Sequence, residues 1–159
     1  MAGNNFSPGL VHAPVTPFTR AGSVDFDLYR KLIEFHLRNG ADALALPMHA
    51  GESVSLTEAE RRALVEFAVK QVQGRVPVVA HVSDAGTGIA AAHARHAEAA
   101  GAAAIVATTP YYWTPPPAMV LEHFVQIGAA VKIPLLVHNA PDEMAGTRIS
   151  AELALKLMD

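Results

Sequence analysis

Residues 76–108, VPVVAHVSDAGTGIAAAHARHAEAAGAAAIVAT, contain the pattern that decides the fold: a strand, a helix and a second strand. The two ends, 76–82 and 103–108, are apolar runs without regular polar alternation, which is typical of strands buried on both faces of a parallel sheet. The alanine-rich segment 86–100 is predicted to be a helix, and Gly101 is a residue type that ends helices. Two parallel strands joined by a helix form a right-handed βαβ unit.

The same unit repeats along the chain. By the same criteria we expect strands at residues 10–15, 43–47, 76–82, 103–108 and 133–138. The helices that follow these strands are expected to begin at Asp25, Thr57, Gly86, Pro116 and Ser150. Asp25 and Ser150 are good capping residues, and Thr57 with Glu60 predicts a capping box.

Five strand–helix units fit two architectures of the α/β class. One is an open five-stranded parallel sheet of the flavodoxin type, which five units complete. The other is a (β/α)8 TIM barrel, which needs eight units and typically ~250 residues, so that the chain would cover about the first five units as a partial barrel. Periodicity leaves both architectures open, and the length of 159 residues favours the open sheet.

Composition excludes several classes of protein. Hydrophobic residues make up 51% of the 159 residues, which suffices for a core, and we expect a single α/β domain over residues 1–159. The net charge of −3 argues against a nucleic-acid partner, because no basic stripe is present to neutralise phosphates. The sequence has no cysteine, which excludes disulfides and thiolate chemistry. We see neither a signal-peptide pattern nor an apolar run of ~20 residues, so we expect a cytoplasmic protein without a membrane partner.

Short motifs along nearly the whole chain resemble those of one enzyme family. The pieces are APVTPF at 13–18, GES at 51–53, LTEAER at 56–61, RVPV at 75–78, TPYY at 109–112, HF at 123–124, IP at 133–134 and NAP at 139–141. In this order and spacing they resemble the dihydrodipicolinate synthase/N-acetylneuraminate lyase family. The resemblance implies a (β/α)8 barrel, a homo-oligomer, and a lyase or aldolase that acts on pyruvate or a related 2-keto acid through a lysine Schiff base. It implies no diffusible cofactor, and it favours the partial barrel over the open sheet.

The Schiff-base lysine of that family lies on the sixth strand, and this sequence ends at Asp159, before such a strand. Lys31, Lys70 and Lys156 fall in expected helices, and Lys132 falls at a helix-to-strand turn, on the face opposite a barrel's site. None of the four is expected to be the desolvated amine that imine chemistry needs. We therefore expect the lysine to lie beyond this chain, and the chain alone to be inactive.

The loop at 48–52, MHAGE, stands where the family has Gly-Thr-Thr-Gly-Glu, which holds the carboxylate of the keto acid. The resemblance implies that His49, Ala50 and Gly51 bind this carboxylate. Backbone N–H groups around Ala50 and Gly51 are suited to an anion, and His49 supplies a side-chain donor.

Two residues are candidates for proton transfer. The resemblance implies that Tyr112 reaches the site of a neighbouring subunit, with Tyr111 and Tyr112 near the interface. His138 stands where the family has a proton-shuttling tyrosine, so Tyr112 and His138 are the candidate catalytic residues.

The turn after residue 138 bears on the second substrate. The arginine that follows in the synthases is absent, and Asp142 and Glu143 occupy that turn. This disfavours a second substrate with its own carboxylate, which would lose its guanidinium partner.

Three histidines, His49, His81 and His138, lie near the ends of expected strands, where α/β folds place their sites. His49 and His138 fit an acid/base pair or hydrogen-bonded pocket residues, and the residues alone leave this open. Three imidazoles suffice for zinc, but no His-x-His or His-x-x-x-His pair stands near these ends, so we expect no metal. The alternative to a lyase is a protein without catalytic activity. It would be a five-unit α/β module that binds a small anion or a partner protein, or a truncated, inactive member of the family.

Overall fold

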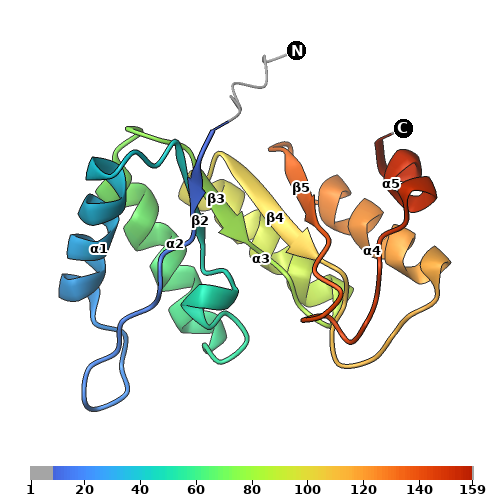
Figure 1. Cartoon of the computed structure of the whole chain (residues 1–159), viewed down its shortest axis with the longest axis horizontal. Helices are drawn as coiled ribbons and strands as arrows, with labels where there is room; N and C mark the ends of the chain where they lie inside the picture. The colour runs from blue at the N-terminus through green and yellow to red at the C-terminus, as the bar shows by residue number, and fades with distance from the viewer. Residues whose placement is uncertain (1–8, 159) are drawn as a thin grey trace.

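The computed structural model describes residues 9–158, which form five parallel strands joined by helices (Figure 1). The strands are β1 (Val11–His12), β2 (Ala43–Leu46), β3 (Val78–His81), β4 (Ala104–Thr108) and β5 (Leu135–His138). The helices are α1 (Phe26–Arg38), α2 (Glu58–Val72), α3 (Thr87–Ala100), α4 (Pro117–Ala129) and α5 (Ala151–Met158), with the short 3-10 helix η1 (His49–Gly51) after β2.

The order of the strands distinguishes the two expected architectures. The strands are neighbours in the order β1-β2-β3-β4-β5, each parallel to the next. A flavodoxin-type sheet has the order 2-1-3-4-5 and helices on both faces. Here each helix packs against the next one in the chain, so the helices form one continuous layer on one side of the strands (Figure 1). The chain is therefore a partial (β/α)8 barrel, and the open-sheet alternative is wrong.

Two cores of unequal size follow from this one-sided arrangement. The larger lies between the strands and the helices, where Leu44 and Ile105 pack with Leu64 and Phe124. The smaller cluster lies on the concave face of the sheet and consists of Ala45, Val79, Ala104 and Val106. Because side chains of a strand alternate between its faces, these residues identify the inward-facing positions of the strands.

The local signals for helix starts are confirmed. The Asp25 carboxylate accepts a hydrogen bond from the Leu28 N–H at 2.9 Å, and Ser150 Oγ accepts one from the Leu153 N–H at 3.2 Å. The capping box between Thr57 and Glu60 is complete. Each cap satisfies N–H groups that the first turn of a helix leaves without an intrahelical partner.

All five strands are shorter than expected; β2 and β4 each lose one residue, and β3 spans Val78–His81 instead of residues 76–82. The edge strands are shortened as well. β1 has two residues instead of the six expected at 10–15, and β5 begins at Leu135 rather than at 133. Pro14 and Pro134 lie at these shortened ends and have no N–H to donate to a neighbouring strand.

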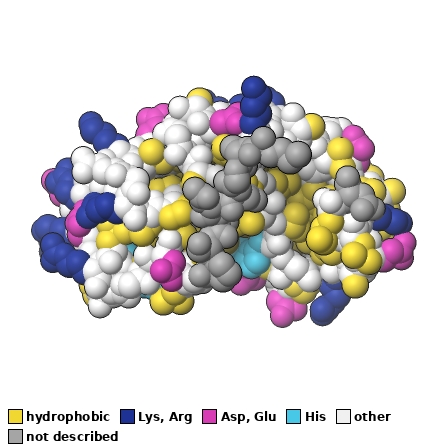
Figure 2. Space-filling model, turned by 90° about the horizontal axis from the view of Figure 1, so that it is seen from above, with side chains coloured by type: hydrophobic (Ala, Val, Ile, Leu, Met, Phe, Trp, Pro, Cys, Tyr) yellow, Lys and Arg dark blue, Asp and Glu magenta, His cyan; other side chains and the backbone are white. Residues whose placement is uncertain are grey.

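Apolar side chains remain exposed on the two edge strands. Val11 of β1 and Leu136 and Val137 of β5 are exposed, and each of these strands has a single neighbour in the sheet. Figure 2 shows apolar side chains reaching the surface between the charged groups at the rim of the molecule.

Within residues 9–158, no helix combines the length and the apolar character needed to cross a bilayer.

Candidate active site

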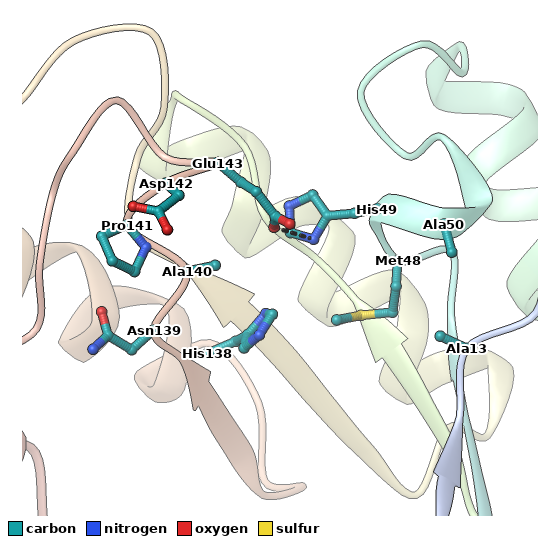
Figure 3. A pocket seen from close by; sticks show the side chains of 10 residues that line it. All are labelled: Ala13, Met48, His49, Ala50, His138, Asn139, Ala140, Pro141, Asp142 and Glu143. Atoms are coloured by element: carbon teal, nitrogen blue, oxygen red, sulfur yellow. Dashed lines mark ion pairs between the residues drawn. The ribbon is translucent and has the colours of Figure 1, made fainter.

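A cavity of about 420 Å³ opens at the carboxyl ends of the strands, on the concave side of the sheet (Figure 3). The residues that line it belong to the segments after β1 and β2 and to the end of β5 with the turn after it. They are Ala13, Met48, His49, Ala50, His138, Asn139, Ala140, Pro141, Asp142 and Glu143. In TIM barrels this face carries the functional groups.

His49 and His138 face each other across this cavity (Figure 3). His49 begins η1, three residues after the end of β2. His138 is the last residue of β5, where it pairs in register with Thr108 of β4. Their ring centroids are 6.0 Å apart. The fold thus brings together two of the site residues expected from the sequence, although β2, which precedes His49, and β5, which ends in His138, are not neighbours in the sheet.

Glu143 binds His49 from the opposite wall of the cavity. Glu143 Oε2 lies 3.0 Å from His49 Nδ1, and the contact joins the turn after β5 to the loop after β2 (Figure 3). The sequence places Glu143 in this turn, but nothing in the sequence indicates that it pairs with His49.

His81 is a third imidazole at this end of the sheet. It occupies the same face of β3 as Val79, two residues earlier, and its ring centroid is 5.9 Å from that of His49. The side chain is 4% exposed. Burial, together with the nearby charge of Arg61, lowers the pKa of His81 to about 3, so the imidazole is neutral at physiological pH.

Four nitrogen atoms of the three imidazoles are buried without a hydrogen-bond partner among the described residues. They are His49 Nε2, His81 Nδ1, His81 Nε2 and His138 Nδ1. Buried polar atoms almost always have a partner, so a group of unpartnered ones indicates a place for water or for a polar ligand.

Arg61 of α2 is a buried residue that sequence reasoning missed. Its guanidinium donates hydrogen bonds to the carbonyl oxygens of His81 at 3.3 Å and Ser83 at 3.0 Å, and it lies 3.9 Å from the Asp84 carboxylate. These contacts fix the carboxyl end of β3, where His81 stands. The available signal was its position, one helical turn before Leu64 on the buried face of α2.

The loop expected to bind a carboxylate divides into two parts. His49 and Ala50 line the cavity, whereas Gly51 is buried and does not line it. The Gly51 N–H donates to the carbonyl oxygen of Met48 at 2.9 Å, so it is occupied within the turn. A Cβ atom at Gly51 would meet the carbonyl oxygen of Pro14 at 3.1 Å, which explains why this position suits glycine.

The tyrosines lie away from the cavity. Tyr112 is 94% exposed and has a φ of +86°, a left-handed value that is strained for a residue with a side chain. Tyr111 is half-buried, and burial raises the pKa of its hydroxyl. Neither residue lines the cavity within this single chain.

Lysines and metal-binding clusters are the two other kinds of group that bear on the chemistry of the cavity. The side chains of Lys31, Lys70, Lys132 and Lys156 are all exposed, and none of them lines the cavity. In the part of the chain that the structure describes, no group of three or more His, Cys, Asp or Glu side chains is arranged to hold a metal ion.

Five consecutive βα units in barrel order, with a cavity at the carboxyl ends of the strands, define a protein of the (β/α)8-barrel class. The chain belongs to the dihydrodipicolinate synthetase family, whose model matches residues 6–159. The family expected from the sequence motifs is therefore confirmed.

Individual relatives agree with this assignment. The 4-hydroxy-tetrahydrodipicolinate synthase of Alkaliphilus oremlandii is 41% identical over 129 residues, which are 81% of this chain and 44% of that protein. The crystal structure of dihydrodipicolinate synthase from Aquifex aeolicus superposes with a TM-score of 0.91 at 36% identity, over 94% of this chain and 50% of that one. A third relative is YagE, a prophage protein of the dihydrodipicolinic acid synthase family from E. coli K12, which was solved in complex with pyruvate. It gives a TM-score of 0.92 at 30% identity, over 95% of this chain and 50% of that one. The chain spans about half the length of these relatives.

Proposed function

We propose that this chain is part of a carbon–carbon lyase or aldolase that acts on pyruvate or a related 2-keto acid. The observation that carries the proposal is the cavity at the carboxyl ends of the strands, with His49, Ala50 and His138 in its wall, in a chain of this family. YagE, which has the same fold over 95% of this chain, was solved with pyruvate.

In this proposal the reaction proceeds through a lysine Schiff base, and the lysine lies outside the 159 residues. An imine forms from a neutral amine, so the lysine must be desolvated or lie beside another cation. The four lysines of this chain are exposed to water and remote from the cavity. The chain alone is therefore inactive as a lyase.

The residues of the cavity take the following roles. The loop of His49, Ala50 and Gly51 receives the carboxylate end of the keto acid, with the backbone at Ala50 in contact with it and the His49 side chain beside it. His138 transfers protons from the opposite wall. Tyr112, which is exposed on this chain, completes the proton relay in the site of a neighbouring subunit of a homo-oligomer, and Tyr111 packs at the same interface.

The charges around the cavity bear on the second substrate. Asp142 and Glu143 line it, and no Lys or Arg is among its ten lining residues. A second carboxylate on the substrate would meet two acidic groups without a guanidinium partner. The proposed partner of the keto acid is therefore an aldehyde or keto compound without a distal carboxylate.

A second function, small-anion binding without catalysis, is supported by the buried imidazole nitrogens of His49 and His138, which have no partner among the described residues and suit a polar ligand. The two are separated by sequencing the gene downstream of the Asp159 codon. If an in-frame segment there places a lysine on a strand, the longer polypeptide should gain one reduced adduct on that lysine after pyruvate and borohydride, measured by intact mass. A reading frame without such a lysine, or a longer polypeptide that gains no adduct, would overturn the lyase.

A further inference from the structure

The contact between Glu143 and His49 determines where the imidazole carries its hydrogen. Glu143 Oε2 lies 3.0 Å from His49 Nδ1 in an ion-pair contact. An ionised carboxylate this close repels a lone pair on the nearer ring nitrogen and favours an N–H there, so Nδ1 is the nitrogen that carries the hydrogen. A neutral imidazole has one N–H, and its other nitrogen then has a free lone pair. That nitrogen, Nε2, is buried and has no partner among the described residues.

The position of Glu143 is set by the fold of the turn that carries it. The Glu143 N–H donates to the carbonyl oxygen of Ala140 at 3.1 Å, and the Gly146 N–H donates to that of Pro141 at 2.9 Å. The next side chain, Met144, is buried. Glu143 is therefore presented to His49 by an anchored turn, although its own side chain is half-exposed.

We propose that Glu143 is a positioning residue that holds His49 in the Nδ1–H tautomer, and that His49 Nε2 is thereby the proton acceptor of the cavity. This inference rests on the proposed keto-acid site. In the cleavage direction, the hydroxyl proton of the bound aldol passes to Nε2 while the carbon–carbon bond next to the hydroxyl-bearing carbon breaks, which leaves an aldehyde or ketone. The electron pair of that bond goes to the imine between the keto acid and the Schiff-base lysine and gives an enamine. The imidazolium, whose positive charge lies against the Glu143 carboxylate, returns the proton to the enamine carbon, so His49 ends the cycle neutral.

This role refines what the sequence predicts for His49. A neutral imidazole with its hydrogen on Nδ1 offers a lone pair at Nε2, and a lone pair repels a carboxylate rather than binding it. The carboxylate end of the keto acid is then left to the backbone of the loop at Ala50. Like the aspartate of a serine-protease triad, Glu143 would act through the histidine that it orients.

The tautomer is measured directly by the imidazole 15N chemical shifts of His49 in the 159-residue chain. We choose about pH 8.5, two units above the ordinary imidazole pKa of ~6.5. In the unmodified chain we expect a protonated Nδ1 and a bare Nε2. Glu143→Ala should abolish this preference, whereas Asp142→Ala, which removes the same charge from the same turn without touching His49, should keep it.

Two results would overturn the dyad: an Nε2–H tautomer in the unmodified chain, or an Nδ1–H tautomer that persists in Glu143→Ala. An unchanged amide spectrum would verify that Glu143→Ala is folded, as its exposure predicts. Adding pyruvate separates this inference from the proposed function. A tautomer that depends on Glu143 without any response to pyruvate would support the dyad and refute the keto-acid site, and a pyruvate response without Glu143 dependence would do the reverse.

Discussion

Replacing His81 with leucine should remove a large part of the acid sensitivity of this protein. The imidazole is buried on the concave face of β3, and burial lowers its pKa to about 3. In the unfolded chain its pKa returns to ~6.5, so between these two pKa values the unfolded state binds a proton at His81 and the folded state does not. Its contribution to stability is complete above ~6.5 and is lost as the pH falls from there toward about 3.

The size of the effect follows from the two pKa values. Each pH unit between them lowers the free energy of unfolding by about 1.4 kcal/mol, so going from about pH 7 to about pH 5 costs roughly 2 kcal/mol through His81 alone. Leucine has no titrating group, so this difference should disappear in His81→Leu. At about pH 7 the variant should be at least as stable, because two unpartnered buried nitrogens, worth roughly 1–3 kcal/mol, are removed.

Urea unfolding followed by circular dichroism, at one protein concentration and a series of pH values, measures both effects. Val79→Ala is the matched control, because Val79 is a buried neighbour on the same face of the same strand. It should lower stability by the same amount at every pH, through the lost packing alone. Parallel pH dependences for the unmodified chain and His81→Leu would refute the account of His81 as a buried neutral imidazole.

Three further outcomes are expected. In a polypeptide that includes the Schiff-base lysine, His138→Ala should lower kcat by ~10²-fold or more, the scale of a general acid–base group, and full activity would make His138 a pocket-filling residue. The 159-residue chain, incubated with pyruvate and borohydride, should show no adduct by intact mass, because its four lysines are exposed and hydrated; a stoichiometric adduct on one lysine would contradict this. Tyr112→Ala should change the free energy of unfolding by less than about 0.5 kcal/mol, since the side chain is exposed. The same variant should weaken self-association in sedimentation, and unchanged association would place the interface elsewhere.

The elements of the fold could be predicted because their signals are local. Asp25, Thr57 and Ser150 cap the helices that they were expected to begin, since a cap depends on only a few adjacent residues. Periodicity could not choose between barrel and open sheet. The choice depends on which strands pair, and sequence motifs rather than physical patterning favoured the barrel.

The site was predictable where the strand ends determine it. His49 and His138 meet because the carboxyl ends of parallel strands converge on one face of a barrel. The ion pair between Glu143 and His49 was not predictable, because it depends on the exact conformations of two turns that are distant in sequence. The burial of Gly51 outside the cavity wall likewise follows from its close approach to Pro14, which no local pattern reveals.

The most direct test of the central claim is a pyruvate titration of the 159-residue chain, followed by amide chemical shifts. The claim is that the cavity between the ends of β2 and β5 receives a 2-keto acid. Pyruvate should move the signals of His49, Ala50 and Ala140 in a saturable way, whereas acetate, a carboxylate without a keto group, should move them less. Shifts confined to residues outside the cavity, or equal responses to acetate and pyruvate, would contradict the claim.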